Sequence, residues 1–225
     1  MKMLDVEEAS IVDEAKKEEE LRAQEEDAAF LGRGKMDLTE VPAGYELVFG
    51  TYNERQLVPA AVRKLVRSFE KEGKHMSQSP IIILVDEEDL VPGTYAKKNE
   101  DVPWHELPMT AFQPRTGKGT KKLIACSGQH RRDAVMFWKQ RMQVKKEKIV
   151  KNIREVEEDH ERRGEGVIDE EEEQLERLRE AVTAFNERIA DAGKWLTLFY
   201  LQSAYAGVTL WDQSVVLIDG VVCDA

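Results

Sequence analysis

The feature that most constrains the fold is the apolar run Pro80-Ile81-Ile82-Ile83-Leu84-Val85. A β-branched run without polar alternation is typical of a strand that is buried on both faces. Strand patterns at residues 45–49, 122–126 and 195–199 surround it in the sequence, together with an amphipathic helix pattern that begins at Pro59. The sequence therefore predicts an α/β fold.

Charge is distributed unevenly along the 225 residues, whose formal net charge is −11. Residues 1–40 carry a net charge of −7, residues 41–150 a net charge of +6 and residues 151–192 a net charge of −8. A basic middle between acidic flanks favours an anionic ligand for the middle segment, and it argues against the whole chain being a nonspecific DNA binder. We interpret residues 1–40 as an acidic, mobile arm.

The cysteine content and the length of the apolar runs indicate where in the cell the protein is expected. Cys126 and Cys223 are the only cysteines, and the N-terminus lacks the apolar region of a secretory signal. No apolar run reaches the length that spans a membrane. We therefore expect an intracellular protein, in the cytoplasm or nucleus, with no disulfide framework and no membrane partner.

A helical pattern starts near Arg131, breaks at Gly164 and Gly166, and resumes after Asp169. The apolar positions of the second helix are spaced alternately by three and four residues, which is a coiled-coil seam. They are Leu175, Leu178, Val182, Phe185 and Ile189. The pattern predicts an antiparallel helical hairpin at residues 145–193. It is either a dimerisation or docking arm, or a spacer whose two helices cover each other.

These patterns divide the chain into four parts. They are the acidic arm 1–40, a domain at 41–144, the hairpin insertion at 145–193, and the closing strand or strands of the domain at 194–225. Asp219-Gly220 is a hairpin signal that leaves little room for a second strand. A truncated end is one interpretation of that segment.

The run Ser127-Gly128-Gln129-His130-Arg131-Arg132, called the box below, follows a strand and opens the long helix. A strand that turns through Ser-Gly into a helix leaves unpaired N–H groups at one point, and the helix dipole adds partial positive charge there. One histidine and two arginines in the first turn oppose that dipole, which indicates a bound anion such as phosphate. Gly128 permits close approach, and Ser127, His130 and Arg131 can donate hydrogen bonds. The alternative is a helix start with exposed basic residues.

The run from Gly128 to Ala134 resembles the Gly-x-x-Arg-x-x-Ala signature of the ParB/sulfiredoxin superfamily. Upstream, Arg55 and the segment Leu57–Val66 resemble the arginine and the Leu-Asp-Pro-x-x-Val helix of that superfamily. Pro80-Ile81-Ile82 resembles its Pro-Ile-x-Val strand. The resemblance covers about residues 45–142, with a closing strand at 195–201. It implies a small mixed sheet with helices, into which the helical hairpin is inserted.

The resemblance also implies a nucleotide ligand, ATP or CTP with Mg²⁺. Carried over by position, Arg131 is the phosphate-binding arginine and Arg55 is the upstream arginine of the same pocket. Gln129 stands where sulfiredoxins have their catalytic cysteine and where ParB proteins have a glutamate. Sulfinic acid reduction is therefore disfavoured, and hydrolysis is in doubt because a neutral amide is a poor general base. Glu54, beside Arg55, is a candidate substitute acid or base, although a surface-loop role is the preferred interpretation.

The favoured function is nucleotide phosphate binding, in a phosphotransferase or NTPase whose ligand contacts come from Arg55 and the box. One alternative is a non-catalytic, nucleotide-gated interaction protein that uses the hairpin for a protein partner or for self-association. Another is a nucleic-acid-associated accessory protein that uses the basic segment 41–150. It is not favoured, because the helices after the box are acidic and heptad-like. The histidines and cysteines show no metal-ligand spacing, so no metal site is predicted.

Overall fold

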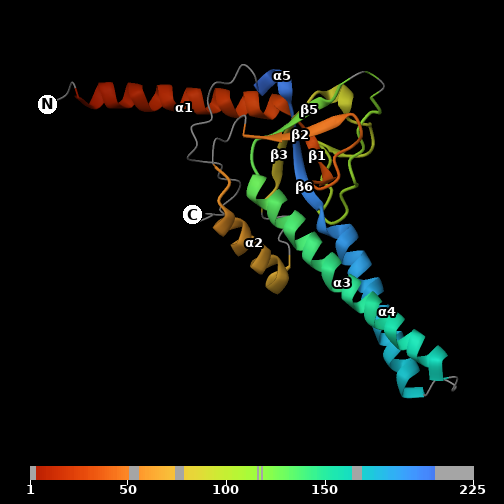
Figure 1. Cartoon of the computed structure of the whole chain (residues 1–225). Helices are drawn as coiled ribbons and strands as arrows, with labels where there is room; N and C mark the ends of the chain where they lie inside the picture. Colours follow the sequence, from red (N-terminus) through yellow and green to blue (C-terminus); the bar gives the residue numbers. More distant parts are fainter. Residues whose placement is uncertain are drawn as a thin grey trace.

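The computed structural model describes residues 4–50, 56–73, 79–115, 117, 119–163 and 169–205. These residues form a six-stranded mixed sheet with helices, which confirms the predicted α/β class (Figure 1). The strands are β1 (Phe30–Asp37), β2 (Tyr45–Phe49), β3 (Ile81–Val85), β4 (Ala96–Lys97), β5 (Lys121–Ala125) and β6 (Lys194–Leu201). The helices are α1 (Leu4–Ala29), α2 (Pro59–Glu72), the 3₁₀ turn η1 (Glu87–Asp89), α3 (Gln129–Arg163), α4 (Asp169–Ala192) and α5 (Gln202–Tyr205).

The sheet has the strand order β2-β5-β3-β6-β1-β4. β3 pairs in parallel with β6 and antiparallel with β5, β2 pairs in parallel with β5, and β1 pairs antiparallel with both β6 and β4. All five residues of β3 are buried. The prediction that residues 80–85 form a strand buried on both faces is confirmed.

Helices cover both faces of the sheet. On one face, α2 and α3 pack on the main core, where Phe69 of α2 stacks against Trp138 of α3 and Trp195 of β6. On the other face, a smaller cluster joins Ile82 and Leu84 of β3 to the last residue of α1 and to α5. The alternating residues of β3 therefore belong to different clusters, which is why this run lacks polar positions.

The predicted boundary at residue 41 is wrong, because β1 lies inside the range that we interpreted as an arm. β1 pairs with β6 over almost its whole length. Both of its glycines, Gly32 and Gly34, are buried. A Cβ at Gly34 would overlap Thr110 Oγ1, and one at Gly32 would overlap the carbonyl oxygen of Ala96. These glycines are needed for packing rather than for flexibility.

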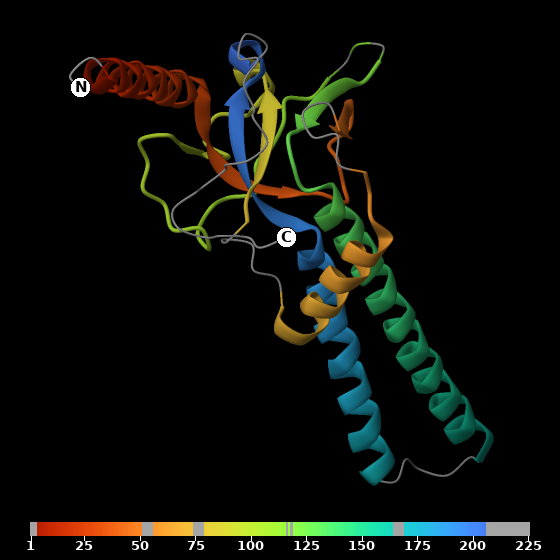
Figure 2. The same cartoon turned by 90° about the vertical axis from the view of Figure 1, so that its left-hand side faces the viewer.

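α3 and α4 form an antiparallel hairpin that extends away from the sheet (Figure 2). Arg179 of α4 is 2.7 Å from Glu157 of α3, and the imidazole of His160 is 2.7 Å from the carboxylate of Glu171. The predicted helical segments at 145–193 are therefore present. The knobs-into-holes packing of a coiled coil remains a prediction, and the expected break at 164–166 lies outside the described residues.

The connection between β3 and β5 packs on the sheet through η1, β4 and buried side chains. Leu90, Tyr95, Leu107 and Phe112 are all buried. Phe112 packs into the main core, whereas Trp104 and Met109 are each 42% exposed. Asp89 is the acidic residue that this connection buries, and it is surrounded by Tyr45, Arg115 and Lys121.

Candidate functional site

The box lies where β5 turns into α3. Ser127 and Gly128 form the turn, and α3 begins at Gln129. Gly128 has a φ of 98°, and a Cβ on it would lie 2.6 Å from Cδ1 of Ile81 in β3. The turn is thus packed against the central strand, and only glycine fits it without strain.

The first turns of α2 and α3 meet at this point. The backbone N–H of Val58, the N-cap of α2, donates a 2.9 Å hydrogen bond to Nε2 of His130. The two helices remain in contact about two to three turns further on, where Phe69 packs against Trp138 and Glu70 pairs with Arg141. Neither first turn contains an acidic residue. Two positive helix ends therefore lie together without a carboxylate of their own to offset them.

The histidine and the two arginines of the box all have protein partners. His130 accepts the Val58 hydrogen bond, so its Nε2 carries no proton in this arrangement. Arg131 donates to the carbonyl oxygens of Ser79 (3.2 Å) and Pro80 (3.4 Å), and Arg132 donates to the carbonyl oxygen of Leu38 and lies over the Phe49 ring. These side chains hold the start of α3 against α2, β3 and the end of β1.

The neutral polar side chains of the box differ in this respect. Ser127 and Gln129 are half-buried. Neither side chain makes a hydrogen bond to any part of the chain that the structure describes. Together with the first N–H groups of α2 and α3, they are the groups of this junction that are available to a ligand.

Two predicted site residues, Glu54 and Arg55, lie outside the described residues. Their position relative to the box stays a prediction. The first turn of α2, with Val58 and Ala60, is the component of the junction that sequence reasoning missed. Pro59 marks the helix start, but no local pattern shows that this start lies against the start of another helix.

Cys126 follows β5, and its N–H donates to the carbonyl oxygen of Ile82 (3.0 Å). Burial raises the pKa of its thiol from 9.0 to about 12. A buried thiol with so little thiolate is a poor nucleophile, which agrees with the interpretation of Cys126 as an inert residue.

In a Cys223→Ser background, we expect Cys126 to react with a disulfide reagent at least about 100-fold more slowly in the native protein than in denaturant near pH 8. Because the folded-state pKa is raised, stability falls as the pH rises from 9.0 toward about 12, and Cys126→Ala removes that contribution. Native labelling as fast as in denaturant would contradict this assignment.

Among the residues that the structure describes, no group of three or more His, Cys, Asp or Glu side chains is arranged to hold a metal ion. No helix within those residues has the length and apolarity needed to cross a bilayer. Comparisons with family models, with curated proteins and with solved structures found no match to this chain.

Proposed function

We propose that this protein binds the phosphate groups of a nucleotide at the junction of α2 and α3. The observation that carries the proposal is the hydrogen bond from Val58 N–H to His130, which places two helix N-termini side by side with no acidic residue in either first turn. Helix N-termini bind anions through their free N–H groups and their dipole. The tight turn at Gly128 lets backbone approach a ligand closely.

The residues of the box do not act together as a simple cluster of cations. Ser127 and Gln129 supply donors whose side chains have no partner among the described residues, whereas Arg131 and Arg132 position the backbone. Mg²⁺ usually keeps several water ligands and binds through one or two carboxylates and the nucleotide phosphates. Described residues offer no acidic cluster for it, so the metal would enter with ATP or CTP. The resemblance to the ParB/sulfiredoxin superfamily is a second support for a nucleotide.

The continuity of α3 also favours the hypothesis of a non-catalytic, nucleotide-gated interaction protein. α3 is one continuous helix of 35 residues, so the helix whose first turn would hold the phosphate also forms half of the projecting hairpin. A ligand at its start acts on the position of that arm directly. Gln129 offers no general base. The enzyme and the non-catalytic protein differ in turnover. Release of phosphate or ADP supports a phosphotransferase or NTPase, and nucleotide binding without release supports the gated interaction protein.

Calorimetry with ATP, CTP and GTP in the presence of Mg²⁺ tests the proposal. We expect saturable binding of at least one nucleotide. We also expect Ala60→Glu to weaken it by at least about tenfold, because a carboxylate in the first turn of α2 offsets the positive helix end. Ala60 is exposed, so the substitution leaves the core intact. The same substitution should leave folding stability unchanged or raise it by about 0.3–1 kcal/mol.

Ala60→Gln is the matched control, since it has the same shape without the charge and should bind like the wild type. Arg131→Ala is a less informative variant, because it releases the carbonyl oxygens of Ser79 and Pro80 as well. If no nucleotide binds, or if Ala60→Glu binds as tightly as Ala60→Gln, the α2–α3 junction is not the site.

A further inference from the structure

The second half of helix α1 has little tertiary support. Every side chain from Ala15 to Ala28 is exposed, and Ala29 at the end of the helix is buried. The helix contains eleven acidic residues against three basic ones, a net charge of −8. An isolated helix that is polar all round gains little stability from its own backbone. A partner of opposite charge would supply what α1 lacks.

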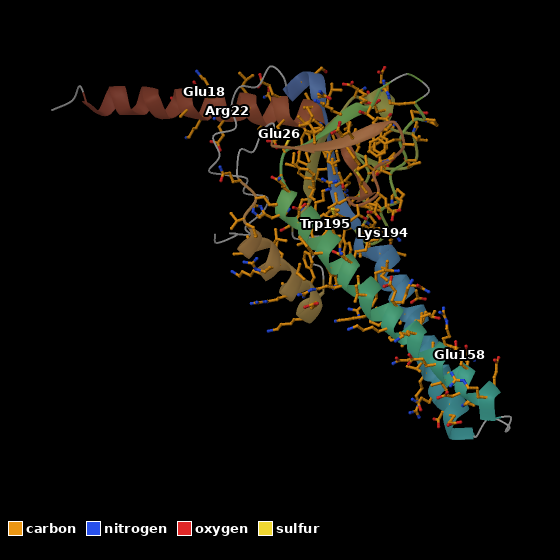
Figure 3. The ribbon with its side chains drawn as sticks, viewed as in Figure 1. Glu18, Arg22, Glu26, Glu158, Lys194 and Trp195 are labelled. Carbon is orange, nitrogen blue, oxygen red and sulfur yellow. The ribbon has the colours of Figure 1, made fainter. Side chains whose placement is uncertain are left out.

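The molecule carries such a surface on α2 and α3. Seven exposed cationic side chains define this surface, called the basic face below. They are Arg63, Lys64, Arg67 and Lys71 of α2 and Arg141, Lys145 and Lys148 of α3. Arg141 pairs with Glu70 at 3.2 Å. Within the described residues, the other six form no ion pair, and Figure 3 shows nitrogen-tipped side chains along the outer side of α2.

α1 does not lie on the basic face of its own copy. Its last turn is fixed at the sheet, because Ala29 is buried there and Lys98 pairs with Asp27 at 2.6 Å. From that point α1 projects away from the sheet, and both views show it apart from α2 (Figures 1 and 2). The labelled Glu18 and Arg22 lie along this free part, and Glu26 lies closer to the sheet (Figure 3).

We propose that α1 of one copy docks along the basic face of a second copy, and that the second copy returns the same contact. An isologous dimer with two-fold symmetry uses each acidic helix and each basic face once, so neither of these two surfaces is left without its counterpart. At 1.5 Å per residue, the 26 residues of α1 extend about 39 Å and the 14 residues of α2 about 21 Å. α1 can therefore cover the outer side of α2 and continue along α3.

Nucleic acid is the rival occupant of the basic face. The whole chain carries a net charge of −11, which repels a polyanion at long range. A nucleic acid would also leave the charge of α1 unmatched. The complementary surfaces on one chain favour a second copy. This inference does not depend on the phosphate site.

Sedimentation equilibrium with the full chain tests the proposal. We expect a dimer at about 50 mM NaCl whose dissociation constant rises at least about tenfold at about 500 mM, because salt screens exposed charges. The acidic-helix variant Glu19→Lys/Glu20→Lys/Glu26→Lys should be monomeric. The basic-face variant Arg63→Glu/Arg67→Glu/Lys71→Glu should also be monomeric. Three reversals reduce the net charge of α1 from −8 to −2, and that of the seven cationic side chains of the basic face from +7 to +1, so each variant loses most of the attraction between the two surfaces.

An equimolar mixture of these two variants is the decisive measurement. Both contacts become complementary again in the mixture, so a heterodimer of wild-type affinity is expected. Glu158→Lys/Glu172→Lys/Glu176→Lys is the matched control, because it makes the same change in net charge on the hairpin and should remain a dimer. Circular dichroism of each variant checks that it is folded.

Three results would overturn the inference. The first is a wild-type monomer at low salt, and the second is a mixture that fails to form the heterodimer. The third is loss of the dimer in the hairpin control, which would place self-association on α3 and α4. A monomer that binds a DNA duplex through the basic face would assign that surface to nucleic acid instead.

Discussion

Replacing Gly128 by alanine should destabilise the fold by about 3 kcal/mol, as a sum of backbone and packing costs. The φ of 98° costs a residue with a Cβ about 1–2 kcal/mol. The new methyl group would also lie 2.6 Å from Cδ1 and 2.9 Å from Cγ1 of Ile81, which has no exposed surface. Urea denaturation of the wild type and the variant measures the change.

Gly93→Ala is the matched control for the backbone part. Gly93 has a φ of 82°, and a Cβ there would meet no atom within 4 Å. The excess cost at Gly128 is therefore the contact with Ile81. Combining Gly128→Ala with Ile81→Val removes Cδ1, so the double variant should lose less stability than the sum of the two single variants. Equal costs at Gly128 and Gly93 would contradict the packing argument.

Replacing Asp89 by alanine should cost about 3 kcal/mol, because it leaves its partners without a counter-ion or acceptor in a buried place. The Asp89 side chain is 4% exposed, and Lys121 Nζ lies 2.5 Å from its Oδ2, although the approach is not aligned as a hydrogen bond. Tyr45 donates a 3.1 Å hydrogen bond to Oδ1. The carboxylate thus joins β2 and β5 to the β3–β5 connection.

A double-mutant cycle measures the interaction between Asp89 and Lys121 separately from the contacts that each residue makes with its other neighbours. Lys121→Met removes the other charge, so Asp89→Ala/Lys121→Met should recover part of the loss. Asp86, whose carboxylate is 2.7 Å from Lys121 Nζ, is the control position, and Asp86→Ala should cost less because this side chain is 38% exposed. Strict additivity of Asp89→Ala and Lys121→Met would show that the ion pair contributes nothing.

The cluster of Tyr45, Asp89 and Lys121 also makes the stability of the fold depend on pH in the alkaline range. Burial and the neighbouring Asp89 carboxylate raise the pKa of Tyr45 above its ordinary value of 10.0. Burial alone would lower the pKa of Lys121, but the close carboxylates of Asp86 and Asp89 raise it above 10.5. Both groups hold their protons more tightly when folded, so their contribution is complete below about pH 10 and is lost as the pH rises further.

Local patterns predicted most of the elements, because burial imposes a period on the sequence. The apolar run at 80–85 predicted β3, and the amphipathic pattern that begins at Pro59 predicted α2. The strand at 45–49 and the long helix after the box were also predicted correctly. β1 was missed, since residues 1–40 were interpreted from their acidic charge, and the pairing of β1 with β6 and β4 joins residues that lie far apart in the chain.

The candidate site was predicted only in part. The sequence identified the turn at Gly128 and the start of α3, but it assigned Arg131 and His130 to a ligand. In the structure these side chains bind Ser79, Pro80 and Val58, which lie far away in the chain. Pairings between distant residues depend on how elements stack, and no local periodicity encodes them.

The sequence by itself determined the α/β class, the strand–turn–helix at the box and the acidic and basic segments, because each follows from residues within one or two turns of each other. Tertiary structure decided that two helix N-termini meet at Val58 and His130, that β1 belongs to the sheet, and that α1 stands free of the basic face. These three outcomes follow from the order in which the strands pair and from what each helix can bury, and that is a property of the whole chain.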